Sequence, residues 1–175
     1  MATITWDFSS ITGDTSSISQ ANLSTIQELI IEAGNFWSRY LAPARDVTLS
    51  IDLNFEEFPG NTLATGGTTF FGTGISSQGF RIGTPITLLE LETGFDVNGA
   101  DGDLFINIDL SSLNFAFFDP DPTARTANVP FNRLDYVSLF IHEIGHALGF
   151  ASFRNSDGNI PDGFGSTFDL SLIHI

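Results

Sequence analysis

RLDYVSLFIHEIGHALG, residues 133–149, carries the strongest helical pattern in the chain. Its apolar residues recur every three or four positions, which predicts an amphipathic helix with one face turned toward a core. These residues are Leu134, Val137, Ile141, Ile144 and Leu148. Asn132, followed three positions later by Asp135, resembles a capping box and predicts where the helix begins. Gly149 stands where the C-terminal cap is expected.

His142, Glu143 and His146 form an HExxH motif within this helix. Residues four apart lie on the same face, with Cβ atoms about 5–6 Å apart, so both imidazoles can bind one metal ion. Imidazole ligands favour zinc over calcium or magnesium. Glu143 lies beside that position, where it could take a proton from a metal-bound water and pass it to a leaving amine. The alternative is two surface histidines with an ordinary helical glutamate.

His142 through Phe150 reads HEIGHALGF, which fits HExxHxxG. This stretch resembles the active-site helix of the zincin metalloproteases and, within them, the metzincin clan with its bacterial secreted and leishmanolysin-like members. The resemblance implies an α+β fold: a zincin N-terminal subdomain with a long N-terminal helix, a mixed twisted β-sheet and an active-site helix, and with the C-terminal subdomain missing. It also implies a secreted, monomeric zinc metalloendopeptidase acting on proteins or peptides, with His142 and His146 as zinc ligands and Glu143 as general base.

The third zinc ligand departs from this resemblance. The clan places a His or Asp three residues after the glycine, where this chain has Ser152, and Met1 is the only methionine, so the methionine turn has no counterpart. Other candidates are Asp157, Asp162, Asp169 and His174.

The last six residues, 170–175, read LSLIHI, which is the translation of a common sequencing-adaptor end. We therefore expect residues 1–169 to form the metzincin-like catalytic domain and 170–175 to be a non-native tail. His174 then has no evolved role, and the missing ligand lies beyond the fragment.

The rest of the chain predicts helices and strands in an order that favours an α+β fold over alternating βαβ units. Helical spacing indicates a helix over 19–41 that begins at Ser19 or Asn22 and buries one side up to Tyr40. Alternating apolar residues predict strands over 46–55 and 103–109. Short strands are expected in the glycine-rich stretch 60–82; 85–92 is ambiguous between helix and strand, and 111–131 and 150–169 are expected as loops.

Two further features have open interpretations. Asp96, Asn98, Asp101 and Asp103 could gather oxygens around a calcium ion, but their spacing is not that of an EF-hand and favours solvated turn residues before a strand. The strand over 103–109 could be the sheet edge that pairs with an extended peptide substrate, or an ordinary interior strand.

Composition excludes several classes of function. The chain has 21 acidic residues against six basic ones and a formal net charge of −15, which disfavours binding to nucleic acid or to an anionic membrane. It has no cysteine, which excludes thiolate zinc sites and cysteine nucleophiles. The N-terminus shows no Sec-type signal, so the protein is cytosolic, or export uses another signal, or the sequence does not begin at the native start.

Two rival functions remain open. One is a non-catalytic binding or matrix domain, a pseudo-protease that retains the HExxH helix. The other is a zinc hydrolase that acts on a non-peptide substrate.

Overall fold

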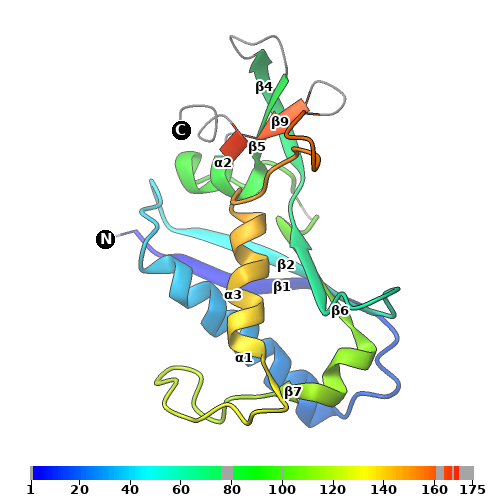
Figure 1. Ribbon diagram of the computed structural model, residues 1–175. Coiled ribbons are helices and arrows are strands. Elements are labelled where there is room, and N and C mark those ends of the chain that lie inside the picture. The colour runs from blue at the N-terminus through cyan, green and yellow to red at the C-terminus, as the bar shows by residue number, and fades with distance from the viewer. Residues whose placement is uncertain (1, 76–80, 100, 161–163, 167, 170–175) are drawn as a thin grey trace.

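The main sheet has four strands in the order β1-β2-β6-β3. Strands β1 (Ile4–Gly13), β2 (Val47–Glu56) and β6 (Leu104–Asp109) are parallel, and β3 (Ala64–Gly67) runs antiparallel to β6 at the edge. The computed structural model describes residues 2–75, 81–99, 101–160, 164–166 and 168–169. The expected mixed sheet in an α+β fold is confirmed (Figure 1).

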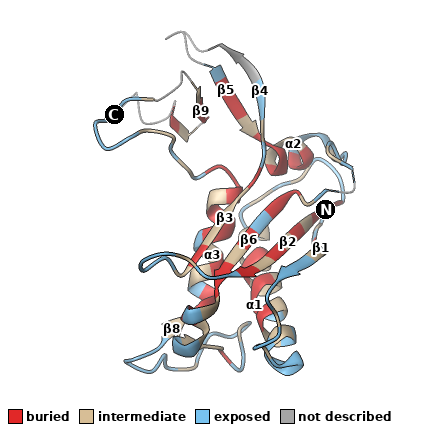
Figure 2. Cartoon of the chain, turned by 90° about the vertical axis from the view of Figure 1, so that its right-hand side faces the viewer, coloured by how far each residue is buried: buried red, intermediate tan, exposed pale blue. Residues whose placement is uncertain are grey.

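One face of this sheet forms the hydrophobic core. Along β2 the residues at every second position are buried, from Val47 to Phe55, and β6 repeats the pattern from Leu104 to Ile108. Helices α1 (Gln20–Ser38) and α3 (Tyr136–Ala147) pack against these side chains and against each other. Figure 2 shows the buried residues concentrated between the two helices and the sheet. The core therefore fixes α3 by long-range packing.

The helix boundaries confirm some predictions and correct others. Ser19 is the N-cap of α1, with its hydroxyl accepting the amide of Asn22 at 3.2 Å. The predicted burial of Tyr40 is wrong, because α1 ends at Ser38 and Tyr40 is exposed beyond it. The predicted capping box at Asn132 is also wrong. Asp135 is the N-cap of α3 and accepts the Val137 amide at 3.1 Å.

A second sheet lies beyond the C-terminal end of α3, in the order β4-β5-β9. It comprises β4 (Phe70–Ile75), β5 (Arg81–Pro85) and β9 (Phe164–Ser166), and β5 leads into helix α2 (Ile86–Thr93). Phe70, Phe153 and Phe164 pack edge to face in it, with ring centroids 5.1–6.3 Å apart. The stretch 150–169, expected to be a polar loop, thus contributes the strand β9 and two aromatic rings, Phe153 and Phe164, to this region.

Three other expectations need correction. The chain begins with a ten-residue strand, β1, that was not predicted, and β1-α1-β2 is a βαβ unit with parallel strands. The expected loop 111–131 starts within the short helix η1 (Leu110–Phe115) and continues into β7 (Ala116–Phe117), which pairs with β8 (Leu134–Asp135). The strand over 103–109 is β6, which lies inside the sheet, so its interpretation as an edge strand is wrong.

Candidate metal centre

The two histidines of the HExxH motif converge on one point. They lie one turn apart on α3, and the Nε2 atoms of His142 and His146 are 2.9 Å apart. Two nitrogens bound at about 2.0–2.1 Å to one tetrahedral zinc ion would be roughly 3.3 Å apart, so a small ring rotation suffices to fit the ion. His142 is exposed and His146 is half-buried, so solvent reaches the pair.

The orientation of His146 is fixed from its other nitrogen. His146 Nδ1 lies 3.0 Å from the Phe150 carbonyl oxygen, and because a carbonyl only accepts, Nδ1 carries the proton. Nε2 of His146 is then unprotonated and accepts a hydrogen bond from Nε2 of His142, and this unprotonated nitrogen is the form that binds a metal. The backbone that presents Phe150 is thus part of the site.

Gly149 provides that backbone. Its φ of +92° is in the left-handed region, and the amides of Gly149 and Phe150 donate to the carbonyls of His146 and Gly145, both at 3.0 Å. These two bonds form a Schellman motif, which confirms the expected C-terminal cap at Gly149. From α1, Trp37 stacks on Phe150 and donates its indole N–H to the Ile141 carbonyl at 2.8 Å.

Glu143 lies on the inner side of the histidine pair and is buried. Burial raises the pKa of Glu143 above its ordinary value, although His142, His146 and the amide of Gly66 act to lower it. Strand β3 passes so close that a Cβ on Gly66 would lie 2.5 Å from the Glu143 carbonyl oxygen. Only glycine allows this approach, which brings the edge strand of the sheet directly beside the HExxH motif.

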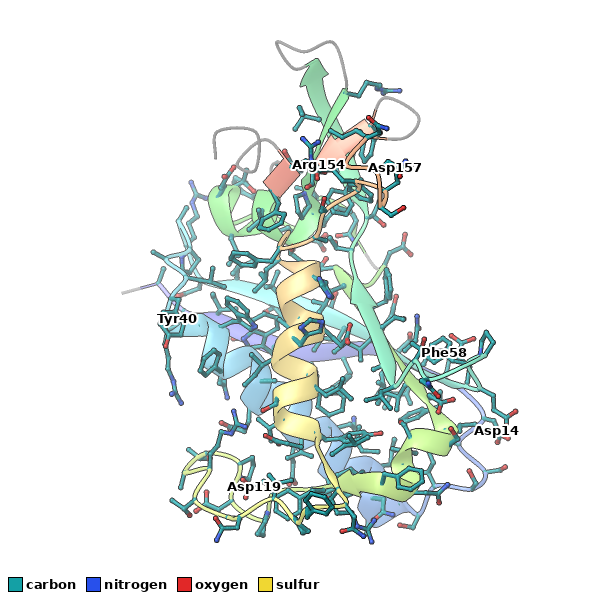
Figure 3. All side chains as sticks on the ribbon, in the orientation of Figure 1. Asp14, Tyr40, Phe58, Asp119, Arg154 and Asp157 are labelled. Atoms are coloured by element: carbon teal, nitrogen blue, oxygen red, sulfur yellow. The ribbon has the colours of Figure 1, made fainter. Side chains whose placement is uncertain are left out.

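No third ligand completes the histidine pair within the described residues. Asp169 is buried and holds the loop after α3, accepting from the Ser152 hydroxyl and from the amides of Phe153 and Ser166 at 2.5–3.1 Å. Asp157 is exposed on the turn beyond α3, as Figure 3 shows. Asp162, His174 and the tail 170–175 lie outside the described residues. The third ligand therefore stays a prediction.

A different set of side chains does come together. Glu90, Asp96 and Asp103 place one carboxylate oxygen each within 4.8 Å of one another, the one such group of three among the described residues. Asp96 and Asp103 belong to the predicted calcium set, whereas Asp101 does not join the group. Glu90 was missed. It lies on the preceding helix, and nothing in its local sequence places it beside two aspartates that follow a turn.

A cavity of about 590 Å³ lies between α1 and the segment at Pro122 and Thr123, and none of its lining residues belongs to either group.

Among the described helices, none has both the length and the apolar character needed to cross a membrane. Comparison of the chain with protein-family models, with curated proteins and with solved structures finds no match. The functional interpretation therefore depends on the geometry of the two groups.

Proposed function

We propose that this chain is the zinc-binding part of a metalloendopeptidase. The observation that carries the proposal is the convergence of the His142 and His146 Nε2 atoms, 2.9 Å apart, with His146 oriented by the Phe150 carbonyl. A bound zinc ion would polarise a substrate carbonyl and lower the pKa of a water molecule. In this proposal a third zinc ligand comes from outside the described residues. The protein is also secreted in this proposal.

Glu143 is the general base in this proposal. It directly follows His142 and lies three residues before His146. Its buried carboxylate has a raised pKa, which suits a group that accepts a proton and then donates it to the leaving amine. The Gly66 amide holds the carboxylate from the side of β3. Glu143 thus needs no movement of the helix to reach the space beside the histidines.

Strand β3 would position the peptide substrate. It pairs with β6 on one side, and among the described residues no strand pairs with its other edge, so backbone groups on that edge other than the Gly66 amide, which is bonded to Glu143, can pair with an extended peptide. Because Gly66 touches Glu143, a peptide paired along this edge would lie next to the general base. This edge strand, rather than β6, takes the substrate-binding role in the proposal.

The test combines metal analysis with a casein-cleavage assay. A longer product of the same gene, which supplies the third ligand, is expected to bind one zinc ion and to cleave casein. In that product Glu143→Gln should lower cleavage by about 10²–10⁴-fold while zinc stays bound. Glu92→Gln, the same change at an exposed position, is the matched control and should leave both unchanged. Loss of zinc in Glu143→Gln would contradict the role of Glu143 as a base.

One observation favours a second candidate function. The described residues supply only two zinc ligands, His142 and His146, as a non-catalytic binding domain that retains the motif would. Stoichiometric zinc without casein cleavage, in this chain and in a longer product of the same gene, would support this alternative. If neither this chain nor the longer product bound zinc, both candidate functions would be contradicted.

A further inference from the structure

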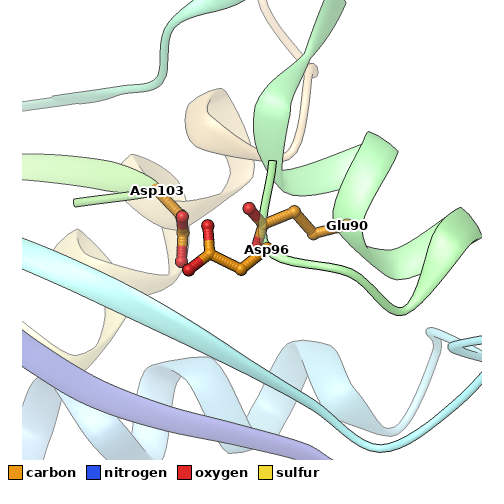
Figure 4. A group of neighbouring side chains, drawn as sticks. All are labelled: Glu90, Asp96 and Asp103. Carbon is orange, nitrogen blue, oxygen red and sulfur yellow. The ribbon is translucent and has the colours of Figure 1, made fainter. Parts of the chain in front are cut away.

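We propose that Glu90, Asp96 and Asp103 form a calcium-binding site, separate from the histidine pair. Their carboxylate oxygens lie within 4.8 Å of one another. Figure 4 shows the three groups pointing toward one another from α2, from the loop that follows it and from the residue before β6. We call this group the carboxylate triad. It lies on elements other than α3, so its ligand does not compete with the histidines.

Glu90 supplies an independent sign of a missing partner. Its side chain is fully buried, and Oε1 accepts the Val97 amide at 2.9 Å, whereas Oε2 has no hydrogen-bond partner. An unpartnered carboxylate oxygen in the interior is costly, and native proteins rarely leave one without a donor or a cation. A cation in the triad would satisfy this oxygen.

In the part of the chain that the structure describes, no basic side chain forms an ion pair with the triad. The two ion pairs among the described residues join Arg125 to Asp135 and Arg154 to Asp169, both elsewhere. Arg45 packs beside the triad loop at Gly94, but its guanidinium lies over the Phe95 ring, 4.8 Å from the centroid. Burial raises the pKa of Glu90 to about 7 against the effect of the Val97 amide, and Asp103 and Asp96 add to the rise. The site thus favours an added positive charge.

The two aspartates are held in place with one oxygen each to spare. Asp103 Oδ2 accepts from the Ser50 amide at 2.6 Å and hydroxyl at 2.9 Å, and Asp96 Oδ1 accepts the Asn98 and Gly99 amides at 3.1 and 2.5 Å. Asp103 Oδ1 and Asp96 Oδ2 take no part in these four bonds. The loop also holds Asn98 Oδ1, which is buried and unpartnered. These positions are preorganised before any ion binds.

Solvent reaches the triad through a polar cavity of about 410 Å³. Its lining includes Asp96 and Asp103 together with Asp7, Asp46 and Ser50. A calcium ion takes six to eight oxygen ligands in irregular geometry, so the three carboxylates need water or further oxygens to complete the shell, and the cavity can hold such water. Further carboxylates along the cavity would attract the cation from solution.

The ligand chemistry distinguishes calcium from other ions. All three ligands are carboxylates, with no imidazole or thiolate, which disfavours zinc. Magnesium requires a near-ideal octahedron at 2.0–2.1 Å and loses its water reluctantly, whereas ligands from a helix, a loop and a strand suit the longer and more variable distances of calcium. Calcium is therefore the expected ion.

Calcium in the triad would cross-link three elements of the fold through their carboxylates. Glu90 lies on α2, Asp96 lies on the loop after it, and Asp103 accepts a hydrogen bond from Ser50 of β2. Helix α2 also braces the end of α3, since Thr87 Oγ1 donates to the Ala147 carbonyl at 2.7 Å. The ion would stabilise the junction between the two sheets.

Thermal unfolding of the whole chain tests the proposal, with calcium chloride as the probe and a chelator as the reference state. At about 100 times the dissociation constant, calcium should raise the unfolding midpoint by about 5–10 °C, with a smaller shift for magnesium. Isothermal titration calorimetry should give one site. Absence of both a shift and a binding heat in the wild-type chain would overturn the proposal.

Two variants separate an ion site from a merely structural cluster. Without calcium, Glu90→Gln should unfold at a higher temperature than the wild type, because it removes a buried charge next to two others. With calcium, the order should reverse. Asp96→Asn should lose the calcium shift, and Asp101→Asn, on the same loop but outside the triad, should keep it. A full shift in Glu90→Gln or Asp96→Asn, or its loss in Asp101→Asn, would overturn the assignment.

Discussion

The histidine pair and the carboxylate triad are two candidate metal sites built in opposite ways. His142 and His146 lie one turn apart on a single helix, so local geometry alone aims them at one point. Glu90, Asp96 and Asp103 come from a helix, a loop and the start of a strand, so only the fold of the whole region brings them together. The first kind of site leaves a motif in the sequence, whereas the second leaves only scattered acidic residues.

The buried glutamates of the two sites differ in the same way. Glu143 is buried beside two histidines and the amide of Gly66, which act to lower its pKa against the effect of burial. Glu90 is buried beside two carboxylates, which raise its pKa further, and one of its oxygens has no partner. The surroundings of Glu143 suit a group that exchanges protons. Those of Glu90 suit a ligand for a hard cation.

The largest expected effect is that a variant at one site loses the metal of that site and keeps the metal of the other. His142→Ala removes one of two imidazoles and should weaken zinc binding by more than about 100-fold, because even groups behind the ligands contribute 10–100-fold. It should leave the calcium-induced rise in unfolding temperature intact. Asp96→Asn should do the reverse. Zinc affinity from competition with a chromogenic chelator and calcium-dependent thermal unfolding measure the two effects.

Loss of both metal responses in one variant would contradict the view that the two sites are independent. If His142→Ala removed the calcium response, or Asp96→Asn removed zinc, the two groups would act as one unit rather than as separate sites. Ser152→Ala, a change in the loop after α3 at a hydroxyl that donates to Asp169, is the control for loop damage and should leave both metal responses within about twofold of wild type.

The contrast also explains which features the sequence could predict. The helix α3, its cap at Gly149 and the HExxH geometry depend on residues within one helix, and strand β2 shows its buried face as a simple alternation. Strand β1 was missed although Ile4, Trp6 and Phe8 alternate, because the alternation stops at Ser9 and Ser10 and the place of the strand was set by pairing with β2. Glu90 and Gly66 were missed because their roles depend on contacts with residues distant in sequence.

The contact between β3 and α3 is the next largest test. Gly66→Ala would place a Cβ 2.5 Å from the Glu143 carbonyl oxygen and 2.6 Å from its Cβ, so the strand or the helix must shift. We expect a loss of about 1–3 kcal/mol in the free energy of unfolding, measured with urea. The calcium-induced shift should persist, because the hydrogen bonds that hold the carboxylates of the triad come from Ser50, Val97, Asn98 and Gly99 and not from β3.

Gly72→Ala is the matched control for this test. Gly72 lies on strand β4, where an added Cβ would meet only the end of the Arg81 side chain, at 3.4 Å. Its free energy of unfolding should change by less than about 0.5 kcal/mol. Equal losses in the two variants would show that the approach of β3 to Glu143 is not specially constrained.

The smallest expected effect comes from a buried carboxylate that needs no cation. Asp109 is nearly as buried as Glu90, but both of its carboxylate oxygens have hydrogen-bond partners. Oδ1 accepts the Phe58 amide at 2.9 Å. Oδ2 accepts the Ser112 amide at 3.0 Å and also the Ser111 hydroxyl. Burial acts to raise the pKa of Asp109, yet these hydrogen bonds outweigh it and lower the pKa below the ordinary 3.8. Its charged form therefore stabilises the fold.

Asp109→Asn should lower the free energy of unfolding by about 1–2 kcal/mol at neutral pH, because the amide nitrogen faces the Ser112 donor. A lowered pKa gives stability that is present above pH 3.8 and is lost as the pH falls through the folded-state value. The difference between wild type and variant should therefore shrink below about pH 3.8, and calcium should not change it. Asp157→Asn, at an exposed position, should show no such pH dependence. A calcium-dependent difference at Asp109 would mean that a fully hydrogen-bonded carboxylate and the triad respond to the same ion, which would remove the distinction between them.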